Sequence, residues 1–156
     1  MRKATNFIVV HCSASPAAAI HVDAKEIDRW HRQRGWLMIG YHYVITRDAA
    51  TQKGRDLDAA GAHVAGHNHE SVGICLIGGT KNDWKTPEDN FTDQQFQALH
   101  SLLLELRRLY PAARIVGHCE LDPKKACPAF DIRSWLAARP ELAPIAKQDS
   151  VKTEPV

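Results

Sequence analysis

The stretch from Gly117 to Pro128 constrains the fold of this chain more than any other. It reads Gly-His-Cys-Glu-Leu-Asp-Pro-Lys-Lys-Ala-Cys-Pro and places His118 and Cys127 nine residues apart on one turn-rich loop. Neutral imidazole and thiolate are the ligands that zinc prefers in proteins. A catalytic zinc takes three ligands from the protein. The fold must therefore bring a third ligand to this loop from a distant part of the chain.

His11 is the candidate for that third ligand. It follows the apolar run Phe7–Val10, which is typical of a buried strand, and the chain then turns polar. A single histidine at a strand end is more often structural, so only its combination with His118 and Cys127 indicates a metal. Since side chains alternate along a strand, Cys12 points away from an inward His11. The sequence thus predicts Zn²⁺ bound by His11, His118 and Cys127.

Length and composition exclude several other classes of protein. The chain has 156 residues, enough for one domain with its own core, and its formal net charge of +2 is too small to indicate nucleic-acid binding. No stretch is apolar and long enough to span a bilayer, and the N-terminal segment does not resemble an export signal. We therefore expect a cytoplasmic monomer with free cysteines, without a nucleic-acid or membrane partner.

The order of the predicted elements indicates an α/β fold. Strands are expected at residues 7–10, 41–46, 72–77 and 114–117, and helices after the capping residues Asp23, Thr92 and Asp131. This order predicts a single domain with a central mixed β-sheet flanked by helices on both faces. Because ligands bind beyond strand ends in such sheets, we expect His11, Tyr41 and His118 around one cleft. The folded domain is placed at residues 1–138 and a flexible C-terminal tail at residues 139–156.

The segment from Gly61 to Ser71 concentrates imidazole and amide groups. It contains His63, His67, Asn68 and His69 directly before an apolar strand. Such groups suit hydrogen bonding to a polar ligand, although His67 is expected to be merely exposed. Three other histidines are expected next to or on helix surfaces, without a function: His21, His31 and His100.

Several short motifs occur together in the order of one known family. They are Val10-His11-Cys12-Ser13-Ala14, Gly40-Tyr41-His42-Tyr43, Arg55-Asp56, His69-Glu70-Ser71-Val72-Gly73-Ile74-Cys75-Leu76, Phe91-Thr92, and the stretch from His118 to Pro128. Through them the chain resembles the zinc-dependent N-acetylmuramoyl-L-alanine amidases, and most of all the amidase-type phage lysozymes, or endolysins. These enzymes are related in fold to peptidoglycan recognition proteins. The resemblance extends from about residue 7 to about residue 136.

The resemblance implies roles for individual residues. The zinc ligands of the family match His11, His118 and Cys127, which leaves the fourth tetrahedral position to water. Tyr41 and Lys125 match a catalytic tyrosine and a catalytic lysine. This chain has one residue more than the family's usual Pro-Lys-Ala-Cys, so Lys124 is an alternative to Lys125. Cys119 stands where the phage enzymes often have a second histidine.

The implied reaction is hydrolysis of the amide bond between N-acetylmuramic acid and the L-alanine of the stem peptide of peptidoglycan. Zinc lowers the pKa of bound water to about 7, so that hydroxide is available to attack the carbonyl carbon. Lys125 would stabilise the oxyanion, with a hydrogen bond from His63 or Tyr41, and Tyr41 or Glu120 would carry the proton to the leaving amine. The residues expected to bind substrate are His63, Asn68 and His69.

As an endolysin, the protein would accumulate in the host cytoplasm and reach the cell wall after another factor permeabilises the membrane. Two alternatives share the fold: a cytosolic amidase that recycles soluble muropeptides, and a module that binds peptidoglycan without cutting it. The second type usually lacks the cysteine ligand, which is present here as Cys127. One branch of the phage enzymes also inhibits the phage RNA polymerase, which makes that polymerase a further candidate partner. The ten residues before His11 are a shorter arm than that branch would need, so we do not predict this activity.

Overall fold

The computed structural model describes residues 1–145 and contains a five-stranded mixed sheet. In sheet order, the strands are β4 (Thr51–Lys53), β3 (Tyr43–Ile45), β5 (Ser71–Leu76), β1 (Phe7–Cys12) and β7 (Arg114–Gly117). Strands β3, β5, β1 and β7 are parallel, whereas β4 is antiparallel to β3. A separate small pair joins β2 (Ser15–Pro16) to β6 (Gly79–Thr80). The predicted mixed sheet is confirmed.

Three of the four α-helices in residues 1–145 begin directly after the predicted capping residues. The four are α1 (Ala24–Gln33), α2 (Asp93–Leu109), α3 (His118–Leu121) and α4 (Ile132–Ala137), with the 3₁₀ turns η1 (Asn68–Glu70) and η2 (Pro140–Leu142). The side chains of Asp23, Thr92 and Asp131 each accept a hydrogen bond from a backbone N–H of the first helical turn. These bonds satisfy donors that have no partner within the helix. The short α3, directly after β7, is the one helix among them that the sequence pattern did not predict.

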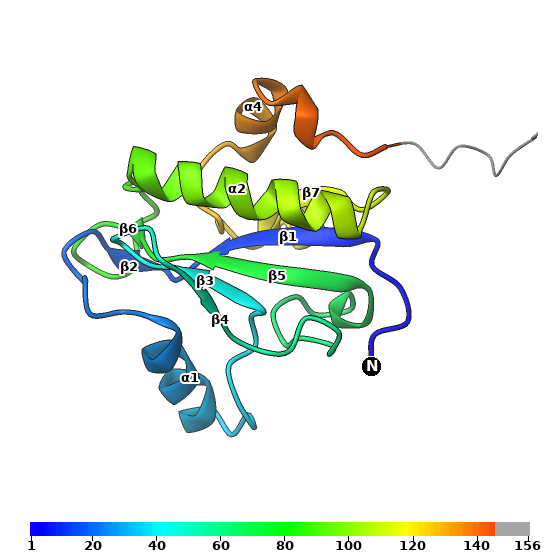
Figure 1. Ribbon diagram of the computed structural model, residues 1–156. Coiled ribbons are helices and arrows are strands. Elements are labelled where there is room, and N and C mark those ends of the chain that lie inside the picture. The colour runs from blue at the N-terminus through cyan, green and yellow to red at the C-terminus, as the bar shows by residue number, and fades with distance from the viewer. Residues whose placement is uncertain (146–156) are drawn as a thin grey trace, which may run out of the picture.

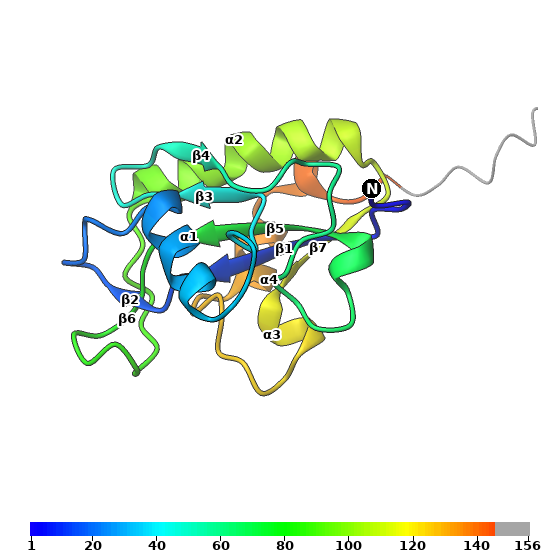
Figure 2. The same ribbon diagram turned by 90° about the horizontal axis from the view of Figure 1, so that it is seen from below.

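Helices cover both faces of the sheet, as predicted (Figure 1). On one face lie α2 and α4, and Leu99 and Leu106 of α2 pack with Ile74 of β5 in the main core. On the opposite face lies α1, whose Ile27 packs with Val44 of β3. Figure 2 looks onto this second face and shows α1 in front of the sheet, α2 behind it and α3 beside the edge strand β7. The central strand β5 is therefore buried on both sides, which explains its continuous apolar character.

Strand β1 brings two predicted ligands together. Its parallel pairing with β7 aligns Val10 with Gly117, so His11 and His118 lie side by side one residue later, with ring centroids 4.6 Å apart. Val10 packs in the main core, so His11 points to the opposite face, which carries α1. The carboxyl edge of the parallel sheet thus joins residues that are more than a hundred positions apart in the sequence.

Two expectations about element boundaries need correction. The strand predicted over residues 41–46 is shorter, because β3 begins at Tyr43. The flexible tail predicted from residue 139 is wrong for residues 139–145. There η2 inserts Leu142, which is 1% exposed, into the main core, and the buried side chain of Arg107 donates two hydrogen bonds to the Leu142 carbonyl oxygen. The remainder of that predicted tail, residues 146–156, lies outside the described residues.

Within residues 1–145, no helix combines the length and the apolar character that crossing a membrane requires.

Candidate active site

Three predicted metal ligands converge at the carboxyl edge of the sheet. One ligand atom each from His11, His118 and Cys127 lies within 4.8 Å of the other two. Ligand atoms of a tetrahedral zinc site with two nitrogens and one sulfur are roughly 3.5 Å apart, so a small contraction would bring this set into bonding range. The donor set and its spacing therefore fit zinc.

Different elements position each member of this trio. His11 is the penultimate residue of β1, and His118 is the first residue of α3. Cys127 comes from the loop after α3, and its sulfur accepts a hydrogen bond from the backbone N–H of Cys12 at 3.0 Å. The Cys119 N–H donates to the Cys127 carbonyl oxygen at 2.9 Å, which closes the loop. As the strand parity predicted, the side chain of Cys12 does not belong to the trio, and neither does that of Cys119, which lies in α3.

The protonation states of the two histidines suit metal binding. Burial lowers the pKa of His11 well below its usual value, and the nearby rings of His63 and His118 lower it further. Burial and the neighbouring Lys125 ammonium lower the pKa of His118. Both imidazoles are therefore neutral at neutral pH, the form that binds a metal ion. The neighbouring Cys12 side chain, foremost, and burial raise the pKa of the Cys127 thiol, so metal binding would release its proton.

A cleft of about 550 Å³ opens beside the trio. It is lined by His11, Cys12, Ser13, Ala14, His31, Arg34, Trp36, Tyr41, Ala62, His63, Val64, Ala65, Asn68, His118, Asp122, Lys125 and Cys127. Volume and lining suit a polar ligand of moderate size.

Tyr41 and Lys125 both line this cleft. The ring centroid of Tyr41 lies 5.0 Å from that of His11. Burial, foremost, raises the pKa of the Tyr41 phenol well above its usual value, with the nearby cysteines adding to the shift. Without a metal, Tyr41 is therefore a hydrogen-bond donor rather than a base. Lys124, the alternative to Lys125, is not among the lining residues.

Glu120 does not lie in the cleft. One of its oxygens accepts a hydrogen bond from the Gly117 N–H at 2.7 Å, and the other pairs with Arg133 at 2.9 Å. The hypothesis that Glu120 carries a proton during the reaction is therefore wrong, because its carboxylate is occupied by capping α3 and by the arginine.

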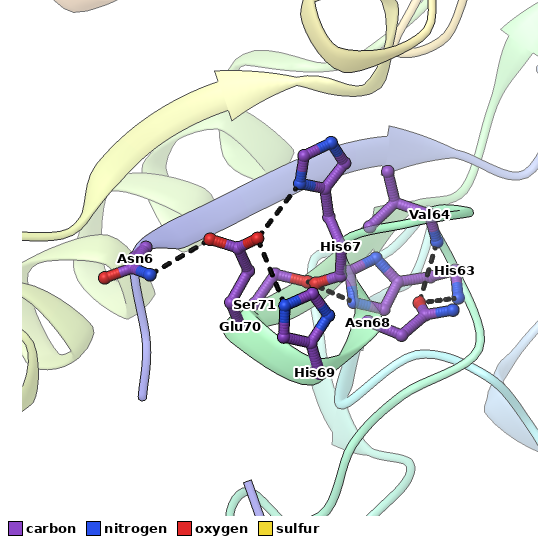
Figure 3. A network of polar contacts seen from close by, with 8 residues as sticks. All are labelled: Asn6, His63, Val64, His67, Asn68, His69, Glu70 and Ser71. Atoms are coloured by element: carbon purple, nitrogen blue, oxygen red, sulfur yellow. Dashed lines mark hydrogen bonds and ion pairs between the residues drawn. The ribbon is translucent and has the colours of Figure 1, made fainter. Parts of the chain in front are cut away.

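The three residues predicted to bind substrate, His63, Asn68 and His69, differ in their position relative to the cleft and in their exposure (Figure 3). His63 lines the cleft but is 9% exposed, and both of its ring nitrogens contact protein atoms: Nδ1 lies 2.8 Å from His11 Nε2, and Nε2 lies 3.2 Å from Ser71 Oγ. No ring N–H of His63 is left for an oxyanion, so its predicted role as an oxyanion donor is wrong. Burial, foremost, lowers the pKa of His63 to about 3.

Asn68 lines the cleft, and its Oδ1 accepts hydrogen bonds from the backbone N–H groups of His63 and Val64, each at 2.9 Å. In contrast, His69 is outside the cleft lining, with a side chain that is 75% exposed and 3.4 Å from Glu70. Figure 3 shows His69 and His67 both directed to the Glu70 carboxylate. The structure thus brings Asn68 to the cleft and leaves His69 on the surface.

The sequence interpretation missed a group of residues on the α1 side of the cleft. His31 was expected on a helix surface, yet it is 5% exposed, and its Nδ1 accepts a hydrogen bond from the Gly40 N–H at 2.9 Å. Arg34 and Trp36 line the cleft with it, the guanidinium lying over the indole ring at 5.9 Å. Their spacing in the sequence could have indicated this group, because His31 and Arg34 are three residues apart and therefore share one face of the helix.

Comparison with known proteins agrees with this geometry. Residues 1–130 match the family described as N-acetylmuramoyl-L-alanine amidase. The chain belongs to this family. The endolysin of Klebsiella phage KP32 is 50% identical over 135 residues, which cover 86% of this chain and 87% of the relative.

Solved structures of amidases and recognition proteins share the fold. The N-acetylmuramoyl-L-alanine amidase LysC from Clostridium intestinale URNW superposes with a TM-score of 0.73 at 29% identity, covering 86% of this chain and 84% of the amidase. Drosophila PGRP-LB has a TM-score of 0.71 at 25% identity, with 92% of this chain and 86% of that protein covered. The predicted fold is confirmed. The family, the relatives and the solved structures together support the predicted function of an endolysin-type N-acetylmuramoyl-L-alanine amidase.

Proposed function

We propose that this protein is a zinc-dependent endolysin that cleaves the bond between N-acetylmuramic acid and L-alanine in peptidoglycan. The observation that carries the proposal is the convergence of His11, His118 and Cys127 beside a polar cleft, in a chain of the amidase family. A zinc ion held by these three residues would supply a water of lowered pKa, about 7, and would polarise the scissile carbonyl.

The residues around the cleft would bind substrate and stabilise charge. Lys125 brings a positive charge to the cleft, on the same side as His118, where it can stabilise a developing oxyanion. Tyr41 keeps its proton and can donate a hydrogen bond to the same oxygen. Asn68 uses its Oδ1 within the loop, which leaves its amide N–H groups to meet a polar group of the stem peptide.

The α1 side of the cleft suits the acidic, polar substrate. Arg34 and Trp36 offer a cation and an aromatic face, which together can hold a carboxylate and the apolar part of a peptide. The protein would act as a monomer and meet the cell wall once another factor has permeabilised the membrane. Peptidoglycan is the one partner that this proposal requires.

The test combines metal analysis with product detection. Purified protein should contain about one zinc per chain, and it should release peptides with free L-alanine amino termini from intact sacculi. Loss of activity on chelation and recovery on adding zinc would support the metal's role. Binding to sacculi without new amino termini would refute the amidase and favour a binding module, while activity restricted to soluble muropeptides would refute the endolysin role.

A further inference from the structure

A chain of hydrogen bonds behind the metal site fixes where protons lie. It runs from the His67 carbonyl oxygen through Ser71 and His63 to His11, and its step between Ser71 and His63 is visible in Figure 3. The Ser71 hydroxyl donates to the His67 carbonyl oxygen at 2.8 Å. A hydroxyl has one proton, so Ser71 Oγ must act as the acceptor towards His63 Nε2, at 3.2 Å. His63 therefore carries a proton on Nε2.

The protonation of His63 Nδ1 and of the two ring nitrogens of His11 follows from this assignment. His63 is 9% exposed and none of its hydrogen-bond partners is a carboxylate, so a charged ring would be poorly compensated. A neutral ring with its proton on Nε2 has a lone pair on Nδ1. That lone pair faces His11 Nε2 at 2.8 Å, so His11 Nε2 is the donor and His11 Nδ1 is left without a proton.

We propose that His63 and Ser71 are positioning residues, which hold His11 in the one tautomer and orientation that offers Nδ1 to the metal. This inference rests on the proposed zinc site. Metal-binding histidines commonly donate their second ring N–H to a protein acceptor, and loss of that acceptor weakens metal binding by about 10- to 100-fold. Here the acceptor is a second histidine, whose own tautomer depends on a serine.

The surroundings of His63 are built to hold its ring. A Cβ atom at Gly73 would lie 2.6 Å from His63 Cγ, and one at Gly61 would lie 2.6 Å from His63 Cδ2. The ring therefore occupies space that any larger residue at either position would take. Glycine weakens the interior of a strand, and Gly73 lies within the buried β5. Its presence is explained by the close approach of His63.

A neighbouring histidine shows the same arrangement independently. His42 Nδ1 lies 3.0 Å from the Gly73 N–H, which can only donate, and His42 Nε2 lies 2.8 Å from the Ala59 carbonyl oxygen, which can only accept. His42 is therefore also neutral with its proton on Nε2. The ring packs edge to face against His63 at 5.8 Å between centroids, so both rings are fixed on the same part of β5.

The experiment measures the tautomers of His11 and His63 and the zinc affinity separately. Long-range ¹⁵N–¹H correlation spectra of metal-free protein should show His11 and His63 as Nε2–H tautomers. Zinc affinity, measured by competition with a chelator, should fall by about 10- to 100-fold in Ser71→Ala and His63→Leu. His63→Asn should retain affinity within a few-fold of wild type, since its side-chain oxygen can accept in place of Nδ1.

His67→Ala is the matched control. Its side chain belongs to the same network, but the chain of hydrogen bonds uses only the His67 backbone, so zinc affinity should not change. An Nδ1–H tautomer of His11, or equal affinities of wild type, Ser71→Ala and His63→Leu, would overturn the inference and leave the amidase proposal standing. If wild type binds no zinc, the proposed function fails, and the tautomers of the metal-free protein still decide whether the hydrogen-bond chain exists.

Discussion

The substitution Gly73→Ala tests the positioning of His63 without touching a ligand or a hydrogen-bonding group. The added Cβ would lie 2.6 Å from His63 Cγ and 2.7 Å from Cδ2, whereas carbon atoms in contact are about 3.5–4.0 Å apart. The ring must therefore move by about 1 Å. The His11–His63 hydrogen bond, now 2.8 Å, would lengthen beyond the usual limit of about 3.2 Å or lose its direction.

We expect Gly73→Ala to weaken zinc binding by about 10- to 100-fold and to reduce the free energy of unfolding by about 1–3 kcal/mol through overpacking. Chelator competition and urea denaturation of the metal-free protein measure the two effects. The double variant Gly73→Ala with His63→Asn removes most of the ring, so it should recover much of the lost affinity. Wild-type affinity in Gly73→Ala, or losses that simply add in the double variant, would refute the reasoning.

Three further outcomes are expected. Cys127→Ser should weaken zinc binding by at least about 100-fold, because a hydroxyl does not ionise as a thiol does; metal analysis after dialysis checks this, and retained zinc contradicts it. Lys125→Ala should keep its zinc yet release amino termini about 100-fold more slowly, with Lys124→Ala near wild type; the reverse ranking would make Lys124 the catalytic lysine. Burial, foremost, lowers the pKa of His31 to about 4 from 6.5. Between these two pH values the unfolded chain binds a proton that the folded chain does not. The free energy of unfolding should therefore drop by up to about 3 kcal/mol as the pH falls from 6.5 to 4. His31→Asn should flatten this dependence in urea unfolding at pH values on either side of the window, and an unchanged slope would exclude His31 as its source.

Much of the fold could be predicted because local patterns agree with the tertiary structure. Apolar runs gave β1, β5 and β7, and the capping residues Asp23 and Thr92 gave the starts of α1 and α2. The end of the folded domain could not be read in the same way. Residues 139–145 contain two prolines and two charged residues, yet Leu142 packs in the main core beside Arg107. A single long-range contact of this kind leaves no periodic signal.

The convergence of His11, His118 and Cys127 was predictable from the sequence because these residue types are chemically distinctive, and because His11 and His118 lie at the ends of buried strands. The supporting residues were not, since their roles depend on distances that a sequence does not encode. His63 is an ordinary candidate for substrate binding until its two nitrogens are seen to be occupied by His11 and Ser71. Likewise the sequence pattern assigns His31 to a helix surface, and only the fold shows that the loop carrying Gly40 packs against it.

The packing of η2 has a practical consequence for anyone who attaches this protein to another. Arg107 also donates to the carbonyl oxygens of Tyr110, Pro111 and Ala113, and the Ile145 N–H donates to Pro111. Cutting the chain at residue 138 would remove two of the bonds that satisfy a buried cation and would uncover an apolar hole. A cargo or wall-targeting module should therefore be joined after residue 145, because η2 and Leu142 then still cover the main core.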